Sequence, residues 1–166
     1  MKSMSIKRGR HYATPFPWPK FICDDTYEKK MTVIFGPSTR YYIGSDQNDI
    51  NKLFGISYGM HHTDSDRIGW RYVIEKDCIE LLTYSYVGGV RTSKHLDYVR
   101  IGDEVEVSLK SCDFGRRRTI EIKAGNKTYR DELPCEWHFF NYTLGLYFGG
   151  NVAAPHDIII EISDVS

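Results

Sequence analysis

Short apolar stretches alternate with turn-forming residues along most of this chain, and within many stretches apolar and polar positions alternate. A period of two is typical of β-strands, because successive side chains of a strand point to opposite faces. No segment keeps the helical period of about 3.6 residues, and only a short helical turn near 47–52 is expected. The pattern predicts strands at 31–35, 39–43, 53–60, 67–75, 78–87, 90–98, 103–111, 117–124, 127–132, 143–149 and 157–163.

Glycines at tight turns separate several of these strands, notably Gly88-Gly89, Gly102, Gly115 and Gly125. About ten strands in one short chain exceed a comfortable open sheet, so the pattern predicts an all-β fold. We expect two antiparallel sheets packed as a jelly-roll-like β-sandwich. The predicted core is Phe54, Ile56, Tyr58, Trp70, Val105, Val107, Leu109, Ile120, Ile122, Leu144, Leu146, Phe148, Ile158, Ile160 and Ile162.

The first 22 residues follow a different pattern. Residues 1–10 carry four basic side chains and no acidic one, and Pro15, Pro17 and Pro19 alternate with Phe16 and Trp18. Proline fixes its own φ and restricts the preceding residue, so this spacing predicts an extended chain. We therefore expect a basic, Pro-rich arm over 1–22 and a single β-sandwich domain over 23–166. The arm would dock its aromatic rings and leave its basic tip for a partner, such as another copy in a homo-oligomer.

Composition narrows the classes of function. The 166 residues hold 22 basic and 22 acidic side chains, so zero net charge makes nucleic acid an unlikely partner. No apolar run is long enough for a secretory signal or a membrane span, which favours the cytoplasm or a particle assembled there. The four cysteines are far apart and form no CxxC pair, so we expect reduced thiols, no metal site and no cofactor.

Three segments carry a resemblance to a known family: VRIGDEVEVSLKSCDFGRRRTIEIKAGNKTYRDEL, then TLGLYFGG, then DIIIEIS. In strand order they resemble the back half of concanavalin A-like lectin and glucanase sandwiches. The resemblance implies a curved sheet whose concave face holds a ligand, often a saccharide. The acidic signature of the family's glucanases, two Glu flanking an Asp, is absent, so hydrolysis is not implied. TLGLYFGG is also similar to a late strand of alginate-lyase jelly rolls.

Strand parity predicts where a ligand would bind. Large side chains at 54, 56 and 58 share one face of a strand and leave Gly55, Ser57 and Gly59 on the other; residues 143–149 repeat this asymmetry with Gly145 and Gly149. The corresponding face of 67–75 carries Arg67, Gly69 and Arg71. Together these faces predict a Gly-floored groove with two guanidinium groups. Alternatively, the glycines permit twist or a bulge, or make room for the Pro-rich arm.

Three hypotheses of function follow. The first is a non-catalytic module that binds an anionic or hydroxyl-rich small molecule, a saccharide or a nucleotide. The second is a polysaccharide lyase or hydrolase on the same face, with His156 or His61 as base and Tyr147 as acid, although His156 could instead tie its loop to the backbone. The third is a phage or capsid-type assembly or attachment protein.

The predicted ligand-binding residues are Arg67, Arg71, Tyr84, Tyr86, Tyr147, Asn151, His61 and His156. Arg116, Arg117 and Arg118 are expected at a solvated hairpin end.

Overall fold

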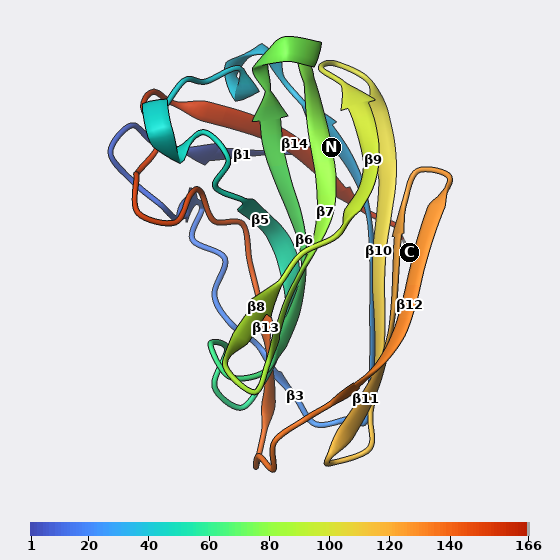
Figure 1. Ribbon diagram of the computed structural model, residues 1–166. Coiled ribbons are helices and arrows are strands. Elements are labelled where there is room, and N and C mark those ends of the chain that lie inside the picture. Colours follow the sequence, from blue (N-terminus) through green and yellow to red (C-terminus); the bar gives the residue numbers. More distant parts are fainter. Residues whose placement is uncertain (166) are drawn as a thin grey trace.

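The computed structural model describes residues 1–165, which form two antiparallel sheets with three short 3₁₀ helices (Figure 1). The strands are β1 (Lys2–Ile6), β2 (Ala13–Thr14), β3 (Phe21–Ile22), β4 (Thr26–Phe35), β5 (Asn51–Tyr58), β6 (Ser65–Val73), β7 (Cys78–Val87), β8 (Val90–Thr92), β9 (His95–Arg100), β10 (Glu104–Asp113), β11 (Arg117–Ala124), β12 (Lys127–Pro134), β13 (Asn141–Leu144) and β14 (Ile158–Asp164). The 3₁₀ helices are η1 (Pro37–Thr39), η2 (Gly44–Asp46) and η3 (Ile74–Lys76). No helix in the described part of the chain is long and apolar enough to cross a membrane.

The two sheets have non-sequential strand orders, as a jelly roll requires. Sheet A runs β12-β11-β10-β4-β14-β1-β2. Sheet B runs β3-β13-β5-β6-β7-β8, and β9 also pairs with β7. The inner faces of both sheets contribute to one large hydrophobic cluster, so the sheets pack face to face. The predicted all-β, jelly-roll-like β-sandwich is confirmed.

The predicted core is also confirmed, with Leu144 half-buried rather than buried. Several details of the secondary-structure prediction are wrong. Residues 40–43 are coil between η1 and η2, residues 90–98 are divided between β8 and β9, and the helical turn lies at η2 rather than near 47–52. The predicted strand 143–149 ends at Leu144, and residues 145–149 are coil with an isolated bridge at Tyr147. Each of these segments is a connection, where polar turn chemistry competes with a short apolar pattern.

The N-terminal residues are part of sheet A. β1 pairs antiparallel with β14 along its whole length, Ile6 is completely buried, and Lys7 Nζ lies 2.8 Å from Asp157 Oδ2. The expectation that residues 1–10 form a basic tip free for a partner is therefore wrong. β1 pairs with β14 and so covers an edge of β14 that would otherwise be open. Residues 7–11 and the Pro-rich stretch 15–20 lack strand structure, and Pro17 lies against Gly145. The expected docking of both aromatic rings is wrong for Trp18, which is 77% exposed, whereas Phe16 is partly covered.

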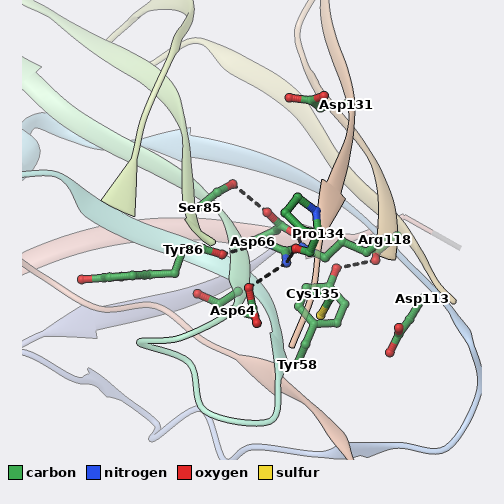
Figure 2. Close-up of polar contacts among 12 residues, drawn as sticks. Tyr58, Asp64, Asp66, Ser85, Tyr86, Asp113, Arg118, Asp131, Pro134 and Cys135 are labelled. Carbon is green, nitrogen blue, oxygen red and sulfur yellow. Dashed lines mark hydrogen bonds and ion pairs between the residues drawn. The ribbon is translucent and has the colours of Figure 1, made fainter. Parts of the chain in front are cut away.

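One guanidinium group is buried between the sheets (Figure 2). Arg118 on β11 is 0% exposed; its Nε donates to Asp66 Oδ2 at 2.7 Å and its Nη1 donates to Asp64 Oδ1 at 3.1 Å. Because Asp66 is on β6, this ion pair connects sheet A to sheet B. The expectation of a solvated Arg116–Arg118 segment holds for its first two residues only. Because side chains alternate along β11, the side chain of Arg118 points between the two sheets.

Candidate functional site

A groove of about 540 Å³ lies on the outer face of sheet B, between β7 and the segment 142–151. The outward direction of Arg67 follows from the alternation of side chains along β6. Asp66 and Ile68 are buried toward sheet A, so Arg67 between them points to the outer face. Six of the predicted ligand residues line this groove: His61, Arg67, Tyr84, Tyr86, Tyr147 and Asn151. The structure thus brings together residues from four separate parts of the sequence.

Two predicted ligand residues lie elsewhere. Arg71 is near the far end of β6, where its Nε donates to Glu80 Oε2 at 2.6 Å and its Nη1 to the Asn48 carbonyl. His156 lies 2.7 Å from the carbonyl oxygen of Ser38 through its Nε2. It ties the 149–157 loop to the backbone, as the alternative interpretation stated. Neither side chain is available to a ligand in the groove.

The glycine floor is also corrected, because the chain's own atoms cover most of these glycines. A Cβ atom on Gly145 would lie 2.3 Å from Pro17 Cβ, and one on Gly69 would lie 2.4 Å from Ile50 Cγ2. Ser57 is fully buried. The alternative explanation, that the glycines make room for the Pro-rich arm, accounts for Gly145. Gly69 instead makes room for Ile50, a contact that neither interpretation predicted. Of the predicted floor glycines, only Gly145 and Gly149 line the groove, together with tyrosine rings and cationic side chains.

Lys52 is the main residue of the site that sequence analysis missed. A β-bulge between Lys52 and Phe54 breaks the alternation of β5, so Lys52 faces the groove although its even number predicts the core face. Its Nζ donates to the Gly149 carbonyl at 2.9 Å and lies 4.6 Å from the Tyr84 ring centroid. Burial, with a smaller contribution from nearby Arg67, lowers the pKa of Lys52 to about 8.

Arg67 occupies the centre of the outer face. It is paired with Gly55 on one side and with Tyr84 on the other, and its Cγ would be 2.7 Å from a Cβ on Gly55. Gly55 therefore gives Arg67 room to lie across the sheet. The Nε of Arg67 is buried without a hydrogen-bond partner among residues 1–165, and burial lowers the pKa of this guanidinium.

The groove has a strongly positive character. Arg91 on β8 lies over the same Tyr84 ring, with its Cζ 5.8 Å from the centroid. Lys52, Arg67 and Arg91 thus converge on one tyrosine, and none of the described residues lining the groove is acidic. Cations in a partly desolvated cleft attract anions strongly. The nearest counter-charge to Lys52 is Asp49, which does not line the groove.

A neutral histidine completes the site. His61 Nδ1 lies 3.0 Å from the hydroxyl of Tyr142, which sequence analysis did not select. Burial, followed by the charges of Arg67 and His62, lowers the pKa of His61 to about 4. The imidazole is therefore uncharged near neutral pH, where it can accept a hydrogen bond.

Comparison with known proteins yields structural likeness only. No family model matches the chain, and no curated protein sequence matches it. A functionally unknown protein from Saccharomyces cerevisiae matches with a TM-score of 0.51 at 6% identity, covering 91% of this chain and 74% of the other. The likeness is one of fold.

Two further solved structures match at lower scores. Alginate lyase A1-II', a member of polysaccharide lyase family-7, has a TM-score of 0.45 at 10% identity over 84% of this chain and 61% of its own. CG-16, a homodimeric agglutinin from chicken liver, has a TM-score of 0.32 at 13% identity over 88% of this chain and 100% of its own. Both scores are too low to say anything about function.

Proposed function

We propose that this protein is a non-catalytic binding module that holds an anionic saccharide in the groove of sheet B. The observation that carries the proposal is the convergence of Lys52, Arg67 and Arg91 where no described lining residue is acidic. A guanidinium fork can bind a carboxylate through two hydrogen bonds, and the unpaired Nε of Arg67 offers one of them. A bound anion would compensate the charge that burial now leaves without a partner.

The aromatic side chains favour a ring-shaped ligand. Tyr84, Tyr86 and Tyr147 supply flat apolar surfaces, while Asn151 and His62 supply polar groups at the rim for hydroxyls. A nucleotide shares the negative charge and the flat ring, so it is the competing ligand class. The proposal favours a uronic-acid saccharide because hydroxyl-binding groups surround the cations.

Isothermal titration calorimetry tests this function with three probes: galacturonate oligosaccharides, neutral cello-oligosaccharides and a nucleoside diphosphate. We expect the galacturonate probe to bind and the Arg67→Ala variant to weaken it about 10- to 100-fold, since a charge-assisted hydrogen bond contributes about 1.5–3 kcal/mol. Arg71→Ala is the matched control, because this arginine is on the same strand but is paired with Glu80 outside the groove. It should keep full affinity.

Several outcomes would contradict the proposal. Binding of none of the probes, or undiminished binding by Arg67→Ala, would show that the groove is not the site. Equal affinity for neutral and acidic oligosaccharides would remove the role of charge. Preference for the nucleoside diphosphate would replace the saccharide by the competing class.

A second candidate function is β-elimination of a uronate polymer by the same groove. The observation in its favour is the uncharged His61 in contact with Tyr142, beside Arg67 and close to Tyr147. His61 would remove the proton next to the carboxylate, a tyrosine would protonate the leaving oxygen, and an arginine would neutralise the substrate anion. Incubation with polygalacturonate and alginate, followed by the ultraviolet absorbance of unsaturated uronates, distinguishes the two functions. Turnover that is lost in His61→Ala while binding persists would establish the lyase.

A further inference from the structure

A second polar cluster lies at the end of the sandwich where β10 ends and the 135–140 loop leads into β13 (Figure 1). Asp113 is the last residue of β10, and Cys135 and His138 are in the loop. The possible ligand atoms of these three side chains all lie within 4.8 Å of one another. None of the three lines the groove of sheet B.

The separation of sulfur and nitrogen suits a shared metal ion. Cys135 Sγ lies 3.8 Å from His138 Nδ1. A tetrahedral zinc ion with its usual bond lengths to sulfur and imidazole nitrogen would place these two ligand atoms about 3.6 Å apart. An ion therefore fits between them with an adjustment of a few tenths of an ångström.

Asp113 fixes the orientation of the imidazole. His138 Nε2 lies 2.8 Å from Asp113 Oδ2, to which Asn141 Nδ2 also donates at 2.9 Å. The backbone N–H of Gly115 donates to the other carboxylate oxygen. A ligand histidine that donates its second N–H to a carboxylate is the arrangement found at most metal sites in proteins.

The groups that face Nδ1 of His138 indicate a positive charge at this nitrogen. With its proton on Nε2 facing Asp113, the ring turns an Nδ1 lone pair toward the Glu136 carbonyl oxygen at 2.8 Å, which can only accept. The Cys135 sulfur also faces Nδ1; as a thiol it can donate to this nitrogen, and as a thiolate it can only accept. Two lone pairs at hydrogen-bond distance repel unless a positive charge lies between them. That charge is either a second proton on the ring or a metal ion.

The surroundings favour the metal ion. Cys135 is 6% exposed, and Asn141, which is 7% exposed, has an Oδ1 with no hydrogen-bond partner among residues 1–165. A cavity of about 540 Å³ bordered by Asp113, His138 and Asn141 provides access for an ion and its water. A soft sulfur ligand beside an imidazole selects zinc-type ions over calcium or magnesium.

We propose that Cys135 and His138 bind a divalent zinc-type ion, with Asp113 as the residue that positions His138. Solvent from the cavity supplies the remaining ligands. Cys135 and His138 are three residues apart, a short spacing that the search for CxxC pairs passed over.

Cobalt and zinc titrations of the chelator-treated full-length protein test the site. We expect one equivalent of Co²⁺ to produce a thiolate-to-cobalt charge-transfer band, and Zn²⁺ to displace it and raise the melting temperature. Cys135→Ser should lose the band, and His138→Ala should bind Co²⁺ far more weakly. Cys78→Ser removes another buried thiol, on β7, and should leave binding unchanged. Asp113→Asn should keep the band but lower the affinity about 10- to 100-fold, as loss of an orienting carboxylate does.

Two results would overturn the proposal. Absence of a cobalt band and of any zinc-induced stabilisation in the unaltered protein would assign the charge at Nδ1 to a proton. A full band in Cys135→Ser would place the metal elsewhere. Because the unaltered protein decides the first result, a variant that fails to fold does not prevent the test.

Discussion

Two buried cations in this sandwich differ in what neutralises them. Arg118 contacts the carboxylates of Asp64 and Asp66 and two backbone carbonyls, whereas Lys52 contacts one carbonyl and the faces of tyrosine rings. The first arrangement satisfies a charge inside the protein, so its role is structural. The second leaves a charge without an acidic partner in hydrogen-bond contact, which is why Lys52 is part of the proposed binding site.

Replacing Arg118 by Met should cost about 3–5 kcal/mol of unfolding free energy, because two carboxylates would remain buried without their cation. Urea denaturation measures the loss. Arg117→Met is the matched control: its side chain is exposed and its pairing with Glu132 is on the surface, so a change below about 0.5 kcal/mol is expected. A small effect of Arg118→Met would mean that the carboxylates find other partners.

Lys52 should make stability depend on pH. Its pKa is about 8 in the folded protein and 10.5 as its ordinary value, so its charge opposes folding at all pH values below about 8. This penalty disappears as pH rises from 8 to 10.5, and the unfolding free energy should rise over that interval by about 1–3 kcal/mol relative to Lys52→Met. Parallel urea titrations of the two proteins at several pH values provide the measurement. Identical pH dependence of both would contradict the depressed pKa.

At the scale of elements, both faces of sheet B are covered over part of their area. Its inner face packs on sheet A, and part of its outer face lies beneath the Pro-rich segment and loops. Prolines pre-extend this segment, so its docking on β13 and the following residues loses less conformational entropy than docking a flexible chain would. Gly145 permits the close approach of Pro17.

Gly145→Val should therefore loosen the Pro-rich segment without unfolding the sandwich. The new side chain would overlap Pro17, and the backbone hydrogen bonds that join Lys20 to Thr143 would weaken. Limited trypsin digestion should cut after Lys20 at least several-fold faster than in the unaltered protein. Gly36→Ala is a control for glycine replacement away from this segment, because the φ of Gly36 is −71° and its Cβ would come no closer than 3.3 Å to another residue. An unchanged cleavage rate would show that the segment is not held at Gly145.

On the scale of the whole molecule, the first strand joins the two ends of the chain. β1 covers the edge of β14, and Ile6 fills the core between the sheets. The hypothesis that the N-terminal residues engage another copy concerns the same strand, since an edge strand can be exchanged between molecules.

Ile6→Ala should lower the free energy of unfolding of the monomer by about 2–5 kcal/mol. Deleting residues 1–10 should lower it by at least as much, because the deletion removes Ile6 together with the rest of β1. Thermal denaturation and size-exclusion chromatography of the deletion, the point variant and the unaltered protein provide the comparison. A lowered melting temperature with unchanged size would show that β1 acts within its own chain. An unchanged melting temperature with a smaller oligomer would support the assembly hypothesis.

Sequence alone determined the architecture and much of the groove. Period-two alternation is a local property, so it placed most of the strands from β4 onward, the core face and outward side chains such as Arg67, but it missed β1–β3. Turn glycines, which need positive φ, marked the hairpins at Gly88, Gly102, Gly115 and Gly125. These features depend on neighbours in sequence, which is why they were predictable.

Only the tertiary structure decided which outward residues share a site. The bulge at Lys52, the pairing of Arg71 with Glu80 and the covering of Gly145 by Pro17 each depend on residues distant in sequence. The same is true of Arg118, which pairs with Asp66 on the other sheet, and of the cluster in which Asp113 at the end of β10 meets Cys135 and His138 of the 135–140 loop. Parity gives the face of a sheet on which a side chain lies, but charge pairing and burial depend on what the fold packs against that face.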